Sequence, residues 1–444
     1  MVDAAAAQTC TVAPDSTVSA TSGTCSIAPN TTLTGTPGVH ASTNAEITTN
    51  NVTINPNNGG SIGGLADTAG TIIFSSGSSI NGNWSTAASA QSGGQIIFQS
   101  GSAINPAFGG GGTALLADGT GSLISATGLT VNLNGAGNNV AGRATNGATI
   151  NLLNDSITYA VGGGGNTGLW ATGSGSQITS TATTISMPGG GGNDVGAKAD
   201  GGGAVTLVGG SVAVEGNGGG ETGLLAQSAG STVKATGVAV TVAGGGGDVG
   251  AKALDGGAVT LNGGSVAATG SGGGEIGLQA SGAGSTLAAT GVTVTVPNSI
   301  GGRGVQADNS GSVTLTAGTT VTTSGAGTHA AGVTSGGTLS MTGGTLTANG
   351  WLQCAQCEWR HRDTQRRDHD QPERGFDRRA RRYQQCEPDR RDGGREQRSM
   401  AERQRRLHAQ PCRRQFDAAG CCPHRRRQYL QCHVAKQFAL DHDG

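Results

Sequence analysis

Four acidic residues recur beside runs of glycine in the middle of the chain, and their side chains could do chemistry. Asp194 and Asp248 each end a glycine-rich stretch and lie 54 positions apart, and Glu221 and Glu275 are separated by the same interval. Carboxylates can ligate calcium, or can act in pairs as the acid and base of glycoside cleavage. Asp194 and Asp248 are therefore candidate calcium ligands, and what they can do depends on the elements that position them.

Cysteines form the second group of residues that could do chemistry. Cys10 and Cys25 lie near the start of the chain, and seven more cysteines follow residue 350. Cys10 and Cys25 fit a small disulfide-closed loop in an oxidising compartment, and two unpaired thiols on a terminal arm are the alternative.

A repeat organises the region that carries the four acidic residues. Residues 195–248 and the stretch that follows are nearly the same sequence, in register at 54 residues, and the unit halves into repeats of 27 residues. A fixed period of this size indicates a solenoid. Short Gly-x-x-Ala segments mark each half repeat, starting at Gly196, Gly223, Gly250, Gly277 and Gly304.

The composition of each repeat predicts strands. Three short runs rich in Val, Thr, Leu and Ala are separated by Gly and Ser, which is typical of strands joined by tight turns. Helices are disfavoured because glycine costs about 1 kcal/mol at each interior helical position relative to alanine. We therefore predict an all-β, right-handed parallel β-helix of about eleven turns, here called rungs. One predicted column of small aliphatic side chains contains Leu224, Ala251, Leu278 and Val305, and Val242 and Val296 share another face.

The repeat also places the acidic residues and the glycine runs. Glycine-rich loops at 109–112, 162–165, 189–192, 218–220, 244–247 and 272–274 fall at the same point of successive rungs, so they are expected along one edge. Residues 54 positions apart are two rungs, or about 10 Å, apart. At that spacing the carboxylates are expected to be solvated loop residues, and we predict no catalysis. His40 and His329 have no evident partner in the sequence for nucleophilic catalysis.

Composition and charge divide the chain into two unlike parts. Residues 1–350 hold 78 of the 83 glycines, with 14 acidic and five basic residues. The last 94 residues hold 14 acidic and 22 basic residues. The body is mildly acidic and sparsely charged, which argues against a nucleic-acid partner.

Four segments are expected along the chain. Residues 1–25 form an N-terminal arm, in which Ala5-Ala6-Ala7 before Gln8 is typical of the end of a secretory signal. Residues 26–63 are Thr- and Asn-rich, and are expected to form a cap or an irregular first turn. Residues 64–350 form the β-helix, in which the larger Ile and Phe of 71–74 and 95–98 predict the best-packed stretch. Residues 351–444 form the tail.

The tail is predicted to be a frameshifted, disordered segment. Read literally, Cys354 and Cys357, the pair Cys421-Cys422, and Cys432-His433 suggest a zinc or redox site, and the arginines suggest nucleic-acid binding. Reverse translation of the first tail residues in the next reading frame permits a string such as GSNALSVNGGTATLNGATT, which resembles the repeat at 330–347. We therefore interpret the tail as a product of a shifted reading frame, and its cysteines as incidental.

The body resembles the passenger region of bacterial autotransporters of the pertactin-like kind. The resemblance covers roughly residues 26–350 and rests on rungs of the GxxA…STVxATGVxVTV type, with no diagnostic motif. It implies an exported protein, displayed on the cell surface or secreted. In that family a β-barrel in the outer membrane delivers the passenger, and this chain contains no sequence pattern for such a barrel. It also implies an adhesin-like role, with host or neighbouring-cell surface molecules as partners and no cofactor.

Two other functions remain open at this stage. A Gly/Asp-rich calcium β-roll would use Asp194 and Asp248, but it requires a nine-residue period with an apolar residue after the aspartate. A β-helix enzyme that acts on polysaccharides would use clustered carboxylates on one face. The spacing favours the interaction protein over both alternatives.

Overall fold

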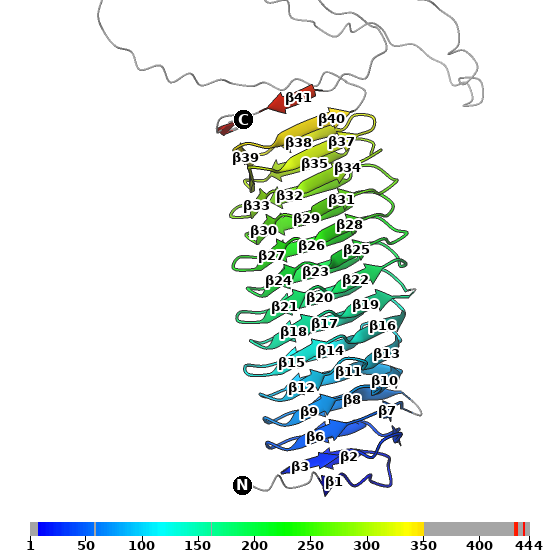
Figure 1. Cartoon of the computed structure of the whole chain (residues 1–444). Helices are drawn as coiled ribbons and strands as arrows, with labels where there is room; N and C mark the ends of the chain where they lie inside the picture. Colours follow the sequence, from blue (N-terminus) through cyan, green and yellow to red (C-terminus); the bar gives the residue numbers. More distant parts are fainter. Residues whose placement is uncertain (1–7, 57–58, 161, 350–429, 434–437, 440–444) are drawn as a thin grey trace, which may run out of the picture. The chain divides into compact units, whose positions relative to one another are not determined.

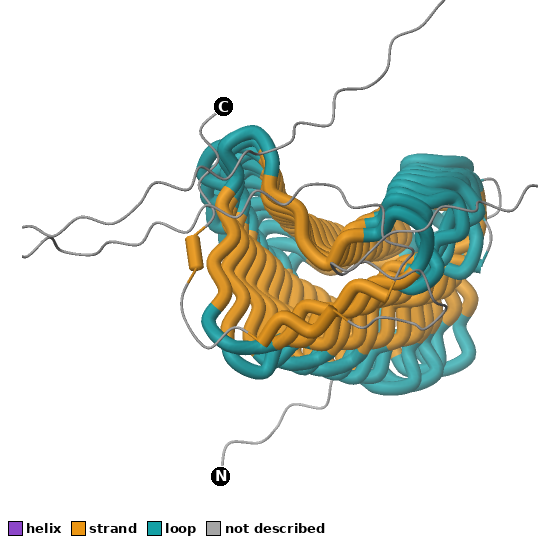
Figure 2. Tube along the Cα trace, turned by 90° about the horizontal axis from the view of Figure 1, so that it is seen from above, coloured by secondary structure: helices purple, strands orange, loops and turns teal. Residues whose placement is uncertain are grey.

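The computed structural model describes residues 8–56, 59–160, 162–349, 430–433 and 438–439, which form three long β-sheets. The prediction of an all-β parallel solenoid of about eleven turns is confirmed, and the described residues contain no helix. Successive rungs lie one on the next along the solenoid (Figure 1). Seen from above, equivalent strands superpose and the connecting loops form columns (Figure 2).

Each rung contributes one strand to each sheet. The 15-stranded sheet contains, in order, β1 (Gln8–Thr9), β3 (Thr24–Ser26), β6 (Glu46–Thr49), β9 (Thr71–Phe74), β12 (Gln95–Phe98), β15 (Leu123–Thr127), β18 (Thr149–Leu153), β21 (Gln177–Thr181), β24 (Ala204–Val208), β27 (Thr232–Thr236), β30 (Ala258–Asn262), β33 (Thr286–Thr290), β36 (Ser312–Thr316), β39 (Thr338–Met341) and β42 (Phe438–Ala439). The 14-stranded sheet contains β4 (Thr32–Leu33), β7 (Thr53–Ile54), β10 (Ser79–Gly82), β13 (Ala103–Phe108), β16 (Thr130–Gly135), β19 (Ser156–Tyr159), β22 (Thr184–Met187), β25 (Ser211–Val214), β28 (Ala239–Val242), β31 (Ser265–Ala268), β34 (Thr293–Val296), β37 (Thr320–Ser324), β40 (Thr345–Asn349) and β41 (Leu430–His433). The 13-stranded sheet contains β2 (Val18–Ala20), β5 (Val39–Ala41), β8 (Gly60–Ala66), β11 (Trp84–Gln91), β14 (Thr113–Asp118), β17 (Val140–Thr145), β20 (Thr167–Thr172), β23 (Val195–Asp200), β26 (Thr222–Gln227), β29 (Val249–Leu254), β32 (Ile276–Ser281), β35 (Arg303–Asp308) and β38 (His329–Val333).

The core consists of columns of equivalent apolar side chains. From β9 to β39, each strand of the 15-stranded sheet places one β-branched or leucine side chain directly above its partner in the previous rung, and none of these side chains is more than 5% exposed. Alternate residues point outward and are mostly Thr, Ser or Ala, because side chains alternate between the two faces of a strand. The inward column runs Ile72, Ile96, Ile124, Ile150, Ile178, Val205, Val233, Val259, Leu287, Val313 and Leu339.

The predicted columns of the central repeats are confirmed. Leu224 pairs with Ala251, which pairs with Leu278, which in turn pairs with Val305, and all four are fully buried. The position at the start of each repeat, such as Gly196, is occupied by glycine because the backbone of the next rung comes very close there. A methyl group on Gly196 would lie 2.7 Å from the carbonyl oxygen of Gly223, closer than real contacts allow.

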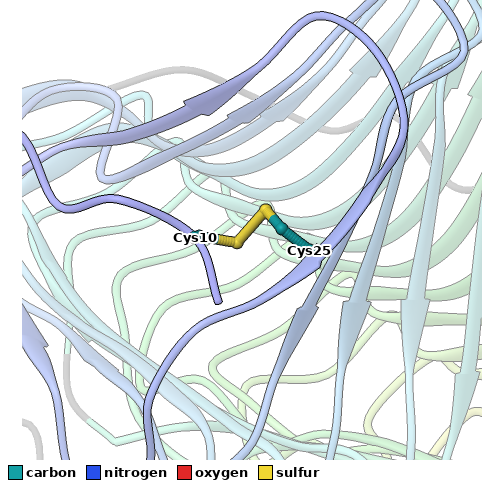
Figure 3. The surroundings of a disulfide bond; sticks show 2 residues. All are labelled: Cys10 and Cys25. Carbon is teal, nitrogen blue, oxygen red and sulfur yellow. A yellow bond between two sulfur atoms is a disulfide. The ribbon is translucent and has the colours of Figure 1, made fainter. Parts of the chain in front are cut away.

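The N-terminal segment joins the stack earlier than the sequence indicates. Residues 26–63, expected to form a cap or irregular first turn, contain β4 to β7, and all four strands pair in parallel with strands of the next rung. Before them, Cys10 and Cys25 form a disulfide with a Cα separation of 5.0 Å (Figure 3). This bond joins the segment after β1 to β3, so it links the first two strands of the 15-stranded sheet.

Aromatic side chains stack in the larger N-terminal rungs. The rings of Phe74 and Phe98 lie 4.7 Å apart between centroids and are nearly parallel, at 8°. They occupy equivalent ends of β9 and β12, and both are buried. Like side chains therefore meet at equivalent positions, as the repeat predicts.

The tail lies almost wholly outside the described residues. Cys354, Cys357, Cys421 and Cys422, which the sequence analysis interprets as incidental, lie outside the described residues. So does most of 351–444, which is predicted to be disordered, apart from two short strands. β41 and β42 pair antiparallel with β40 and β39, at the C-terminal ends of two sheets. Across the described ranges, no helix is long and apolar enough to cross a membrane.

Candidate functional site

The glycine-rich loops form one column, as predicted. Each joins a strand of the 14-stranded sheet to the next strand of the 13-stranded sheet, and we call this column the glycine corner. Backbone hydrogen bonds of 3.0 to 3.2 Å connect its rungs, for example from Gly220 N–H to the carbonyl oxygen of Gly246. Because each loop is hydrogen-bonded to the next, the corner is a continuous layer. Its glycine-rich loops are 109–112, 136–139, 162–166, 188–194, 215–221, 243–248 and 269–275.

The four acidic residues end consecutive loops of the glycine corner. Asp194, Glu221, Asp248 and Glu275 each precede the first residue of β23, β26, β29 and β32, respectively. Thr222 N–H donates to the Asp194 carbonyl oxygen at 2.9 Å, and Val249 N–H donates to that of Glu221 at 2.8 Å. The four side chains therefore form one column, called here the carboxylate column.

The expectation that these carboxylates are solvated loop residues is wrong. Asp194, Glu221, Asp248 and Glu275 are each 0% exposed. The expected spacing of two rungs between carboxylates is also wrong, because aspartate and glutamate alternate along the column. Neighbouring carboxylates are thus one rung, or about 4.8 Å, apart instead of two. The signal was present in the sequence, because 27 residues separate Glu221 from both Asp194 and Asp248.

Asparagines continue the column toward the N-terminus. Asn166 N–H donates to Asp194 Oδ1 at 2.7 Å, and the Asn166 side-chain amide donates to the same oxygen at 3.2 Å. One rung earlier, Asn139 N–H donates to Asn166 Oδ1 at 3.0 Å. An amide both donates and accepts, so a neutral side chain satisfies its neighbours at this position. Replacement of the amide by a carboxylate from Asp194 onward removes those donors.

Only part of the carboxylate column is hydrogen-bonded. Asp248 Oδ1 accepts from Gly220 N–H at 3.0 Å and from Glu221 N–H at 3.1 Å. Glu275 Oε1 accepts from Gly273 N–H at 2.9 Å, and its second oxygen accepts from the Ser299 hydroxyl. Among the described residues, no partner is found for Asp194 Oδ2, Asp248 Oδ2 or either carboxylate oxygen of Glu221.

Burial without partners makes the ionised carboxylates costly. Burial raises the pKa of Asp194 to about 6, although hydrogen bonds from Asn166 oppose the shift. Burial, with a smaller contribution from the adjacent Asp248 carboxyl, raises the pKa of Glu221 to about 8. No ion pair within the described ranges involves the column. An uncompensated charge of this kind costs several kcal/mol in a protein interior.

A basic and aromatic column lies on the outward side of the 13-stranded sheet. Arg143, Trp170, Lys198, Leu225 and Lys252 occupy equivalent positions of β17, β20, β23, β26 and β29. The Arg143 guanidinium lies 4.5 Å from the Trp170 ring centroid and the Lys198 ammonium 4.8 Å from it, so the ring lies between two cations. All five side chains are partly exposed. We call these five residues the basic-aromatic column.

His40 has a partner that the sequence did not suggest. Its Nε2 lies 3.1 Å from Asp67 Oδ2, and both side chains are partly exposed. The expectation that His40 has no partner is therefore wrong, because stacking brings residues 27 positions apart together. His329 lies at the start of β38, with an exposed side chain.

A pocket lies at the N-terminal end of the glycine corner. It has a volume of 490 Å³, and Asn83, Trp84, Ser85 and loop glycines at 59–60 and 109–112 line it together with Thr36 and Ser61. None of these side chains titrates near neutral pH. The pocket therefore offers hydrogen-bonding groups without an acid or base.

Asp155 is a buried carboxylate outside the glycine corner, and its titration is expected to change stability. It is 3% exposed and accepts from Leu129 N–H at 2.7 Å and Leu153 N–H at 2.8 Å. Burial raises its pKa from 3.8 to about 6, so the protonated form is favoured in the folded state. The resulting stabilisation is complete below pH 3.8 and is lost as the pH rises through about 6.

We predict that ionisation of Asp155 lowers the free energy of unfolding by roughly 1 kcal/mol when the pH rises from 5 to 7.5. Urea unfolding of the wild type and of Asp155→Asn at both pH values isolates the effect, since the variant lacks the titrating group. Parallel pH profiles of the two proteins would contradict it.

Comparisons with family models, with curated proteins and with solved structures find no match to this chain. Among the described residues, no three acidic, histidine or cysteine side chains converge as a metal cluster would. The structure instead offers two linear features, the carboxylate column inside the glycine corner and the basic-aromatic column on an outer face.

Proposed function

We propose that the chain is an exported, adhesin-like rod, the passenger of a bacterial autotransporter, which attaches to molecules of other cell surfaces and catalyses no reaction. The observation that carries the proposal is the continuous parallel stack of about eleven turns. Such a stack buries a long core from small residues and leaves an extended outer surface, and solenoids use such surfaces to bind partners. The resemblance of the repeats to autotransporter passengers supports the same assignment.

The Cys10–Cys25 disulfide supports export. Disulfides form and persist in oxidising compartments and are rare in the reducing cytosol. The bond joins the segment after β1 to β3, at the N-terminal end of the 15-stranded sheet. We therefore place the protein outside the cytoplasm, on the cell surface or secreted.

Burial of the carboxylate column argues against a polysaccharide-acting enzyme. A glycosidase needs two carboxylates that reach the same sugar from opposite sides of the bond. Asp194, Glu221, Asp248 and Glu275 have no exposed surface, so a polymer outside the solenoid cannot contact them. Asp67 and His40 lie together on an outer face, but one pair gives no second carboxylate.

The basic-aromatic column indicates the chemistry of the partner. Four of the five basic residues of the body lie on the 13-stranded sheet, and three of them are in this column. Partly exposed Trp170 holds the Arg143 and Lys198 cations on either side of its ring, so it positions the charges that a partner would contact. Because the rest of the body is acidic, this column is the surface that would attract an anionic polysaccharide.

Attachment of beads coated with the full-length protein to epithelial cells tests the function. We expect the coated beads to attach, and Trp170→Ala with Lys198→Ala to reduce attachment about fivefold or more through loss of cation–π and charge contacts. Lys234→Ala is the matched control, because Lys234 is exposed on the 15-stranded sheet and lies outside the column. Failure of wild-type beads to attach would overturn the function. Equal losses in the column variant and the control would overturn the assigned surface.

A further inference from the structure

We propose that the carboxylate column is a calcium site, in which Ca²⁺ is held inside the glycine corner by Asp194, Glu221 and the main-chain carbonyl oxygen of Gly191. The inference is independent of the adhesin role. It keeps Asp194 as a candidate ligand and adds Glu221, its neighbour in the next rung, which the sequence analysis did not pair with it.

The position of the ion follows from the space beside Gly216. A methyl group built on Gly216 would lie 2.6 Å from Glu221 Oε1, 2.8 Å from the Gly191 carbonyl oxygen and 3.4 Å from Asp194 Oδ2. Three oxygens from two neighbouring loops, 188–194 and 215–221, therefore face one space beside Gly216. Calcium binds oxygen at 2.3–2.6 Å, and an ion held here must lie farther from the Gly216 Cα than this methyl position. The two carboxylates must therefore shift toward the Gly191 carbonyl oxygen to bring all three oxygens into the coordination range of the ion.

The oxygens that surround this point lack other partners. Asp194 Oδ2 and Glu221 Oε1 are fully buried and accept no hydrogen bond from any described residue. The second oxygen of Glu221 is also unpartnered and lies beside Gly244 and the carbonyl oxygen of Gly218. Buried oxygens that carry negative charge need a counter-charge, and the ion pairs of the described residues supply none here.

The donor set selects the kind of ion. Carboxylate and carbonyl oxygens are hard ligands, and there is no nitrogen or sulfur donor among the side chains of the column. Calcium tolerates irregular geometry and accepts main-chain carbonyl ligands, whereas magnesium demands a near-octahedral shell and retains its water. The main-chain carbonyl oxygen in the donor set therefore favours calcium.

Glycine is required at the positions that face the carboxylates. Gly216 and Gly244 lie two residues after the ends of β25 and β28, and a side chain on either would occupy the space beside Glu221. The glycine runs thus keep the interior of the corner open to the ion. Since the ligands come from neighbouring rungs, the bound ion would join those rungs and stabilise the stack.

Calcium titration of the full-length protein tests the proposal. After removal of divalent ions with chelator, isothermal titration calorimetry measures binding, and urea unfolding followed by circular dichroism measures stability. We expect calcium to bind and to lower the unfolding equilibrium constant about 100-fold when free calcium is ~100 times its Kd. No binding and an unchanged urea midpoint would overturn the site, and an equal response to magnesium would overturn the choice of calcium.

Two variants separate this site from surface binding. Glu221→Gln should abolish the calcium response and, with chelator present, should be at least as stable as the wild type, because glutamine cannot ionise in the buried column. Asp255→Asn is the control, because Asp255 is exposed in a turn after β29, and its calcium response should match the wild type. A wild-type response in Glu221→Gln would overturn the site.

A second variant keeps the test decisive if Glu221→Gln fails to fold. Asp194→Asn retains an oxygen acceptor for Asn166 N–H, so the backbone contact is preserved. It should weaken calcium binding at least tenfold. Unchanged affinity in this variant would overturn the assignment of Asp194 as a ligand.

Discussion

Replacement of Val259 by aspartate is expected to unfold the central rungs. Val259 is 1% exposed and lies between Val233 and Leu287 in the core column of the 15-stranded sheet. A carboxylate there would meet only apolar side chains above and below, and an unpaired buried charge costs more than about 4 kcal/mol. Urea unfolding followed by far-ultraviolet circular dichroism should give a midpoint far below that of the wild type.

The adjacent residue supplies the matched control for this prediction. Thr260 lies on the same strand but points outward, next to Lys234 of the preceding rung. Thr260→Asp should change the free energy of unfolding by less than about 0.5 kcal/mol, since an exposed carboxylate keeps its water. Similar losses in the two variants would contradict the inward and outward alternation on which the stack depends.

Phe98→Ala should destabilise the N-terminal rungs by about 3–5 kcal/mol. Phe98 is 2% exposed and stacks on Phe74 at 4.7 Å between ring centroids. Removal of the ring leaves a cavity in an interior that only the neighbouring rungs can fill, and it also removes the aromatic stacking. Urea unfolding measures the loss, and hydrogen exchange of β9 and β12 should locate it.

Ile97→Ala on the same strand is the control for the aromatic stack. Ile97 points outward and is partly exposed, so its truncation should cost about 1 kcal/mol. If Ile97→Ala and Phe98→Ala destabilised the protein equally, the stacked pair would not be the main packing contact of these rungs.

The fold could be predicted from the sequence because one rung predicts the next. Equivalent positions carry the same kind of residue, so the sequence alone predicts that Leu224, Ala251, Leu278 and Val305 lie in one column, as they do. The first rungs were harder to recognise. Their strands are only two to four residues long and their loops lack the glycine runs, so β4 to β7 read as an irregular cap.

The candidate site was predicted only in part. The sequence placed Asp194 and Asp248 beside glycine runs, but periodicity alone does not say whether a loop residue points inward or outward. The structure shows them buried, because the loops fold over the ends of the strands and glycine leaves room beneath. Glu221 was not grouped with them because repeats compared at an interval of 54 residues align Asp with Asp and Glu with Glu. At the true interval of 27 residues, Asp and Glu alternate in one column.

The basic-aromatic column was hidden for another reason. Arg143, Trp170 and Lys198 differ in residue type, so no repeated letter marks their shared position in the sequence. The register of β17, β20 and β23 brings them together, and the two cations then lie within 4.8 Å of the ring centroid. A contact between unlike residues becomes visible only when the register is known.

Distances between spin labels on the outer face of the 15-stranded sheet test the stack most directly. Thr179, Thr206 and Thr314 occupy equivalent outward positions, with Thr206 one rung beyond Thr179 and four rungs before Thr314. Labels on ketone-bearing side chains avoid the native cysteines. The backbone separation should be about 19 Å for Thr206 with Thr314 and about 24 Å for Thr179 with Thr314. The account predicts that the distance to Thr314 is one strand spacing longer from Thr179 than from Thr206, which lies 27 residues later in the sequence. A difference unrelated to the strand spacing would contradict the solenoid.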